Sequence, residues 1–204
     1  MPKKGIFIVI DGIDGSGKTT IADFLRDYLK QRGYNIMSLS SPSDSENGRY
    51  LKDLLRKKDS NKIKPEKWVE LFKENMDESQ QIIRGAIEEG TIVIIDRYYY
   101  SSLAYLLDPK QWQAYSELFF KPEIVFILDV DVKTGLKRVE EKYKKTKEKK
   151  AYFEKEKILK EVRKKFLALP QFLKDNIKII DSNREIKDVW FDVKKEINVL
   201  IDKK

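Results

Sequence analysis

Residues 7–20 read FIVIDGIDGSGKTT, and this stretch decides the fold. Its first part, Phe7–Ile10, is a short apolar run rich in β-branched residues, which is typical of a strand buried on both faces. The next eight residues, Gly12–Thr19, match the P-loop pattern G-x-x-x-x-G-K-[ST] at every fixed position. Apolar residues then recur at helical spacing from Ile21 to Leu29. The order strand, glycine loop, helix is the context that this motif requires.

The residue types of the loop explain how it would hold phosphate groups. Its glycines leave room for an oxygen-rich ligand, and the backbone N–H groups of the loop and the first helical turn point at one place. Lys18 would bring a full positive charge to the β- and γ-phosphates, and Thr19 a hydroxyl to Mg²⁺. The alternative, a glycine-rich turn that binds nothing, fits less well because pattern and context agree over the whole stretch.

Composition narrows the class of protein. The chain has 204 residues, 41% of them hydrophobic, so we expect a single domain (1–204) with a small inserted lid near residues 143–153. Cysteine and histidine are absent, so acid–base or metal chemistry must use carboxylates, lysine, hydroxyls or water. The start is short and polar, and no apolar run is long enough to span a membrane, so we expect a cytoplasmic protein.

The net charge of +8 allows three interpretations. A nucleic-acid partner and a site for nucleotide polyanions are two of them. The third is a solvated surface rich in lysine and glutamate, as hyperthermophile proteins often show. We favour this thermophile-like surface, with local basic clusters that bind the ligand.

Five apolar segments alternate with helical patterns along the chain. The expected strands are 7–10, 35–39, 91–95, 124–129 and 177–180. This alternation predicts a three-layer α/β/α fold with a five-stranded, mainly parallel sheet. Ligands bind at the carboxyl ends of such strands, so Asp11, Asp96 and Asp129 should point into one crevice. For Asp129, simple solvation or helix capping is an equally good interpretation.

Several further segments resemble the thymidylate kinase family of P-loop nucleoside monophosphate kinases. Residues 96–105, DRYYYSSLAY, are similar to its signature DRY-x-x-S-x-x-A-Y. Leu71-Phe72 is similar to its base-stacking motif, and residues 122–131, 153–154 and 181–185 also match. The P-loop alone is shared by many ATPases and GTPases, whereas the DRY segment is much more selective.

The resemblance implies transfer of the ATP γ-phosphoryl group to a deoxynucleoside 5′-monophosphate, most simply dTMP giving dTDP. It implies ATP and Mg²⁺ as donor and cofactor, no nucleic-acid or membrane partner, and a possible homodimer. Arg97 would bind the acceptor phosphate, and Asp96 would either hold Mg²⁺ through water or only fix Arg97. Asp14 would contact the 3′-hydroxyl, Phe72 would stack on the base, and Tyr105 would crowd the sugar 2′-position.

The residues that the resemblance implicates form four groups. The catalytic group is Lys18, Arg97 and Asp96, and the metal ligands are Thr19 and Asp96. The ATP contacts are Gly12, Asp14, Gly15, Ser16, Gly17, Lys18, Thr19, Thr20, Arg138, Asn183 and Arg184. The acceptor contacts are Asp14, Arg49, Phe72, Arg97, Ser101 and Tyr105, with Lys52 as an alternative to Arg49.

This chain departs from the family pattern at several places, one of which is the loop before the second expected helix, where the usual arginine is missing and Arg49 or Lys52 would assist with the acceptor phosphate. Gly15 stands where some members carry an arginine, and members without it place basic residues in the lid. The lid candidates here are Lys144, Lys145, Lys147, Lys149 and Lys150, although a run of charges is usually a solvated surface. Met76 and Leu106 stand where polar residues usually read the base. We therefore expect relaxed base selectivity, with dUMP accepted beside dTMP and purine deoxynucleotides as the next candidates.

Two other functions compete with the kinase. One is a nucleic-acid-binding P-loop ATPase that uses the basic surface, and the other is a nucleotide-binding homologue without catalysis. The spacing of the DRY segment and the lack of an evident nucleic-acid module favour the kinase.

Overall fold

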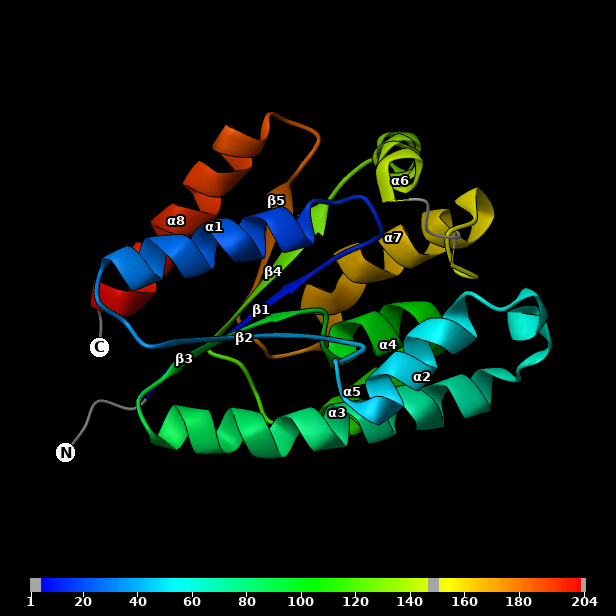
Figure 1. Cartoon of the computed structure of the whole chain (residues 1–204), viewed down its shortest axis with the longest axis horizontal. Coiled ribbons are helices and arrows are strands. Elements are labelled where there is room, and N and C mark those ends of the chain that lie inside the picture. Colours follow the sequence, from blue (N-terminus) through cyan, green and yellow to red (C-terminus); the bar gives the residue numbers. More distant parts are fainter. Residues whose placement is uncertain (1–4, 147–150, 203–204) are drawn as a thin grey trace.

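The computed structural model of the chain describes residues 5–146 and 151–202. Its centre is a five-stranded sheet with the order β2-β3-β1-β4-β5, in which all four pairings are parallel (Figure 1). The strands are β1 (Phe7–Asp11), β2 (Ile36–Ser40), β3 (Ile92–Asp96), β4 (Ile124–Asp129) and β5 (Ile177–Asp181). The predicted α/β fold is confirmed, and the sheet is parallel throughout, because a crossover helix or helices join every pair of strands.

Helices cover both faces of the sheet and complete the three layers (Figure 1). They are α1 (Lys18–Gln31), α2 (Glu46–Leu55), α3 (Pro65–Glu88), α4 (Tyr99–Leu106), α5 (Pro109–Ser116), α6 (Val132–Thr146), α7 (Glu156–Phe172) and α8 (Ile186–Asp202). A 3₁₀ turn, Lys58–Lys62, joins α2 to α3. Side chains alternate along β1, so Ile8 and Ile10 pack with α1 and α8, whereas Phe7 and Val9 pack with α3, α4 and α7.

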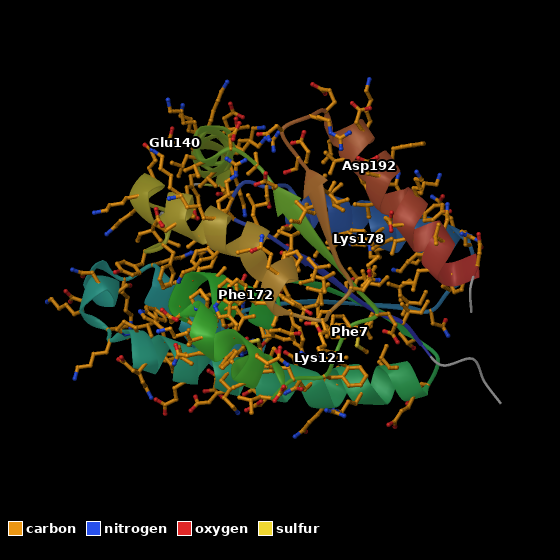
Figure 2. The ribbon with its side chains drawn as sticks, turned by 180° about the vertical axis from the view of Figure 1, so that it is seen from behind. Phe7, Lys121, Glu140, Phe172, Lys178 and Asp192 are labelled. Carbon is orange, nitrogen blue, oxygen red and sulfur yellow. The ribbon has the colours of Figure 1, made fainter. Side chains whose placement is uncertain are left out.

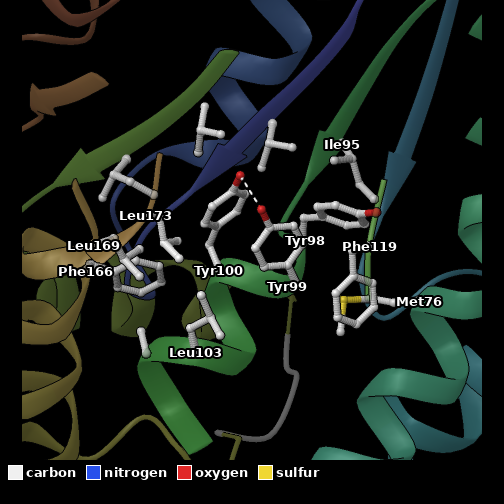
Figure 3. Packing of buried hydrophobic residues seen from close by; sticks show 14 of the residues in the cluster. Met76, Ile95, Tyr98, Tyr99, Tyr100, Leu103, Phe119, Phe166, Leu169 and Leu173 are labelled. Carbon is white, nitrogen blue, oxygen red and sulfur yellow. Dashed lines mark hydrogen bonds between the residues drawn. The ribbon is translucent and has the colours of Figure 1, made fainter. Parts of the chain in front are cut away.

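Three consecutive tyrosines, Tyr98, Tyr99 and Tyr100, fill the core between α4 and the sheet (Figure 3). The hydroxyls of Tyr99 and Tyr100 lie 2.8 Å apart, and Asp175 Oδ2 lies 2.5 Å from the first and 2.8 Å from the second. Burial raises the pKa of both tyrosines, so both hydroxyls stay neutral and donate hydrogen bonds. This cluster fixes the start of α4 against the loop that precedes β5.

Two prolines lie within helices. Pro109 is the first residue of α5, and Asp108 and Gln111 form a capping box around it. Pro170 lies inside the last turns of α7. A proline there removes a single backbone hydrogen bond close to the helix end, and the buried Leu169 and Leu173 hold the segment in place.

Charged side chains cover the outer surfaces of the helices, for example Glu140 on α6 and Asp192 on α8 (Figure 2). Many form pairs one turn apart, such as Lys160 with Glu156 at 2.7 Å. Exposed pairs of this kind contribute only about 0.3–0.5 kcal/mol each. Within the two described ranges, no helix is long and apolar enough to cross a membrane.

The N-terminal part of α6 packs directly on the P-loop, backbone against backbone. Gly15 has φ +79°, and a Cβ atom added there would lie 2.1 Å from the carbonyl oxygen of Gly135. A Cβ atom at Gly135 would lie 2.7 Å from the carbonyl oxygen of Asp14. The approach requires that both positions lack a Cβ atom, so glycine at 15 and at 135 allows α6 to lie beside the phosphate-binding loop.

Gly135→Ala should therefore lower the free energy of unfolding by about 1–3 kcal/mol, because α6 must move away from the loop. Gly85→Ala is the matched control, since Gly85 is an exposed helical glycine with no heavy atom within 4 Å of an added Cβ. The control should gain about 0.5–1 kcal/mol. Urea unfolding of the three proteins measures both effects, and equal stability of the Gly135→Ala protein and the wild type would contradict the close contact.

Candidate active site

Two pockets adjoin at the carboxyl edge of the sheet and share Asp14, Ser41, Pro42 and Arg97 in their linings. The first, about 580 Å³, has mainly apolar walls. The second, about 1460 Å³, opens over the P-loop. The first is walled by Phe72, Tyr105, Leu106 and Phe153; the second by Gly15, Gly17, Lys18, Thr19, Thr20 and Arg138. Ligands that fill the two pockets would meet beside Asp14 and Arg97.

Lys18 lies at the base of the second pocket and closes the P-loop around itself. Its Nζ donates a hydrogen bond to the carbonyl oxygen of Ile13 at 2.9 Å. Burial, together with the nearby positive charge of Arg97, lowers the pKa of Lys18 to about 8. A phosphate bound in the second pocket would place a negative charge next to the ammonium group of Lys18.

Thr19 and Asp96 offer a pair of oxygen atoms to a cation. The Thr19 hydroxyl donates to Asp96 Oδ2 at 2.7 Å, and both residues line the second pocket. Mg²⁺ prefers hard oxygen ligands and keeps several waters, so two protein oxygens beside bound phosphates are enough. These residues therefore fit the metal that the family resemblance implies. In the described residues no group of three or more acidic side chains suits a metal.

Arg97 lies where the two pockets meet, and its backbone is strained. Its φ of 71° is left-handed, which costs a residue with a side chain roughly 1–3 kcal/mol. Its guanidinium group donates to Asp14 Oδ1 at 2.5 Å, to the Gly12 carbonyl at 3.1 Å and to Ser101 Oγ at 3.0 Å. Burial alone would lower its pKa, but Asp14 and other nearby acidic groups raise it above the ordinary value. Arg97 is thus a fixed, permanent cation.

Asp14 connects Tyr105, in the aromatic wall of the first pocket, to Arg97. The Tyr105 hydroxyl donates to Asp14 Oδ2 at 3.1 Å, and the Tyr105 ring lies 5.7 Å from the Arg97 guanidinium carbon. Burial would raise the pKa of Asp14, but the charges of Arg97 and Lys18 lower it below its usual range. Asp14 is therefore an ionised acceptor at the junction of the pockets.

The three aspartates at strand ends do not share one crevice as expected. Asp96 lines the second pocket, whereas Asp11 is fully buried beneath it. Asp129 forms a bidentate ion pair with Arg163, with N–O distances of 2.6 and 2.9 Å. Burial raises the pKa of Asp11. Strand position alone placed these residues at the right edge of the sheet but did not reveal which way each side chain turns.

The predicted acceptor contacts divide into two sets. Phe72, Ser101 and Tyr105 line the first pocket, together with Asp14 and Arg97. Arg49 is exposed and donates to the carbonyl oxygen of Asp44, and it does not line either pocket. Its alternative, Lys52, does line the second pocket and pairs with Asp44 at 2.6 Å.

The base-reading positions also separate. Leu106 lines the first pocket, but Met76 is only 1% exposed and belongs to the buried core cluster that contains Phe119 (Figure 3). Ser102, which the sequence did not single out, lines the first pocket and is 2% exposed. Its Oγ interacts with the Tyr115 hydroxyl, and neither oxygen makes a hydrogen bond of normal geometry within the described part of the chain. Phe153, noted only as a family match, supplies a wall.

The remaining predicted ATP contacts surround the P-loop. Arg138 lines the second pocket and donates to the carbonyl oxygens of Gly15 and Ser182 at 3.3 and 3.1 Å. Asn183 Oδ1 accepts from the backbone N–H of Asp131 at 2.8 Å, and Arg184 forms an ion pair with Asp192. Asn183 and Arg184 are exposed on the loop between β5 and α8, and adenine contact there stays a prediction.

The structure describes two of the five predicted lid lysines. Lys144 and Lys145 are exposed at the end of α6, and Lys147, Lys149 and Lys150 lie outside the described residues. Lys142 and Tyr143, which the sequence did not single out, line the second pocket. The Tyr143 hydroxyl donates to Glu154 Oε1 at 2.6 Å, and this contact connects α6 to the segment before α7. Burial raises the pKa of Glu154.

Comparisons with known proteins agree with this geometry. The family model described as thymidylate kinase matches residues 10–193. A probable thymidylate kinase of Archaeoglobus fulgidus is 31% identical over 98% of this chain and 98% of its own length. One of Pyrococcus horikoshii is 32% identical over 93% and 94%. A thymidylate kinase of Brachyspira hyodysenteriae is 33% identical over 68% and 70%. The chain therefore belongs to the thymidylate kinase family.

Proposed function

We propose that this nucleoside monophosphate kinase transfers the γ-phosphoryl group of ATP to dTMP, giving dTDP and ADP. One observation carries the proposal: a P-loop pocket with Lys18 adjoins an aromatic pocket with Phe72, and Arg97 lines both. Of the alternatives, a nucleic-acid-dependent ATPase has no need of a second, aromatic pocket, and a homologue that only binds nucleotide has no need of a fixed cation where the two pockets meet.

Positioning and charge account for the chemistry. An oxygen of the acceptor phosphate attacks the γ-phosphorus, the bond from that phosphorus to the β–γ bridging oxygen breaks, and ADP leaves. The P-loop N–H groups and Lys18 would stabilise the negative charge on the donor phosphates. Arg97 would orient the acceptor phosphate, since its planar guanidinium group can contact two oxygens at once. Mg²⁺, when held near Thr19 and Asp96, would neutralise further phosphate charge.

Phe72 and Tyr105 would bind the nucleoside part of the acceptor. Phe72 would stack on the base, which tolerates any base because each has a π face. Tyr105, held by Asp14, would exclude a 2′-hydroxyl sterically. Mg²⁺ dependence, a cytoplasmic location and a homodimer remain predictions of the sequence.

Coupled ADP-release assays with dTMP test the function. Wild-type protein should release ADP in a dTMP-dependent, saturable way, with no stimulation by DNA. Lys18→Ala should lower kcat by about 10²–10³-fold, because a preorganised charge at the transferred group is lost. ADP release that requires DNA and ignores dTMP would replace the kinase with the ATPase, and no release by folded protein would leave a binding homologue.

The lowered pKa of Lys18, about 8, predicts that ATP binding weakens in alkali. An ordinary lysine stays protonated to about pH 10.4. Above pH 8 the free protein increasingly carries a neutral Lys18, and ATP must bind together with a proton. The ATP association constant should fall by up to about tenfold per pH unit from pH 8 to pH 10.

Calorimetric titrations at pH 7, 8, 9 and 10 measure this profile. The chain lacks histidine and cysteine, so few other side chains titrate near pH 8. Lys18→Arg keeps its charge across the range and should give a flat profile. A wild-type profile equally flat would show that Lys18 stays charged in the free protein.

Base selectivity should be modest, because the walls of the first pocket are mainly apolar. The Ser102 hydroxyl in its lining can either donate or accept a hydrogen bond. We expect kcat/KM for dUMP and dCMP within roughly 10–200-fold of dTMP, the range that apolar contact can supply. Ser102→Ala should lower kcat/KM for dTMP by roughly 3- to 10-fold, since one hydrogen bond to the base is lost. The free variant should lose little stability, because the Ser102 hydroxyl contacts only the Tyr115 hydroxyl and makes no hydrogen bond of normal geometry within the described residues.

Ser116→Ala is the matched control for Ser102→Ala. Ser116 is 1% exposed, and its hydroxyl donates to the carbonyl of Gln113 at 2.8 Å, away from both pockets. This control should lose stability and keep its kinetics. A dTMP preference of about 10⁴ or more in the wild type would show that another group reads the base.

A further inference from the structure

Asp11, the last residue of β1, is a fully buried carboxylate that faces four hydrogen-bond donors. Its Oδ1 accepts from the Gly12 N–H at 2.8 Å and from Ser101 Oγ at 2.7 Å. Its Oδ2 accepts from the N–H groups of Tyr98 at 3.2 Å and Ser101 at 3.0 Å. An ionised carboxylate accepts hydrogen bonds without donating any, which suits a site that presents only donors.

These donors come from the two halves of the active site. Gly12 is the first residue of the P-loop, whereas Tyr98 and Ser101 belong to the start of α4. The N-cap residue of α4, Tyr98, makes no side-chain capping bond of its own. Asp11 accepts from the Tyr98 and Ser101 N–H groups at the start of the helix instead, and so caps α4 from a neighbouring strand.

Arg97 lies between the two halves and depends on the same carboxylate. Its Nη1 lies 3.8 Å from Asp11 Oδ1. The two groups that accept from Nη1, the Gly12 carbonyl and Ser101 Oγ, belong to residues that themselves donate to Asp11. The guanidinium group of Arg97 is thus held between two residues that donate to Asp11.

We infer that Asp11 is a positioning residue, which fixes the P-loop and Arg97 relative to each other and so sets the separation of donor and acceptor phosphates. The inference rests on the proposed phosphoryl transfer. Phosphoryl transfer depends on alignment of the two phosphates, and a small misplacement lowers the rate of the chemical step without removing either ligand. Loss of Asp11 should therefore lower kcat while ATP and dTMP still bind separately.

Asp11→Asn tests this separation of effects. The amide has nearly the same shape, but its NH₂ group would face two hydrogen-bond donors. The carboxylate oxygen at that place accepts a hydrogen bond from each of them. We expect kcat to fall at least tenfold, with the calorimetric Kd of a non-hydrolysable ATP analogue and of dTMP, each titrated alone, within threefold of wild type.

Asp175→Asn is the matched control. Asp175 is also a largely buried carboxylate that holds α4, through the hydroxyls of Tyr99 and Tyr100, but it touches neither the P-loop nor Arg97. The control should lower Tm and keep kcat within twofold. If both variants lower kcat in proportion to their loss of Tm, Asp11 acts only on stability and the inference is overturned.

A second variant covers the case that Asp11→Asn does not fold. Ser101→Ala cuts the hydroxyl contacts to Asp11 and Arg97 and leaves no new polar group in the core. In this variant kcat should fall by a larger factor than the Kd of either ligand rises. An unchanged kcat would overturn the inference. Wild-type turnover of dTMP is measured beside each variant, so a failure of the proposed function, with no wild-type turnover, is separate from a failure of the inference.

Discussion

The parallel register of β1 between β3 and β4 is the constraint on which the site depends. Ile10 lies opposite Asp96 on one side and Phe126 on the other. The Arg97 N–H donates to the Ile10 carbonyl at 2.9 Å, one step past the end of β3. A slip of one residue would exchange the side chains that face the two helical layers, so the buried core resists it. The P-loop and Arg97 are therefore brought together by the backbone ladder, and their side chains only refine the geometry.

The charged groups of the site must be held together before any phosphate binds. Lys18 and Arg97 lie close enough that each disfavours the charge of the other. Asp14 and Asp96 offset this repulsion, and Asp14 also pairs directly with Arg97 at 2.5 Å. Bound phosphates would add negative charge to the same region, which favours the charged form of Lys18. The carboxylates thus hold the cations in place at the moment when no ligand does.

The sequence alone predicted those parts of the structure that depend on a local pattern with a single physical explanation. The P-loop, the five strands and the pocket residues Phe72, Arg97 and Tyr105 follow from spacing and from the family resemblance. It was insufficient where the outcome depends on contacts between distant segments. Met76 occupies the expected position in α3, yet its side chain turns into the core. Ser102 looks like any helical serine, and only the fold shows that it lines a pocket and that its buried hydroxyl lies beside the Tyr115 hydroxyl.

The contact between Gly15 and Gly135 decides which cations of α6 line the second pocket. An arginine at position 15, as in some family members, would need space that the Gly135 backbone fills. The same contact turns one face of α6 toward the second pocket, and Arg138 and Lys142 lie on that face, three and seven residues after Gly135. Lys144 falls about 180° around the helix from Gly135, at about 100° per residue, and points away. We therefore expect the charge that an arginine at position 15 would supply to come from the inner face of α6, ahead of the lysine-rich segment at 144–150.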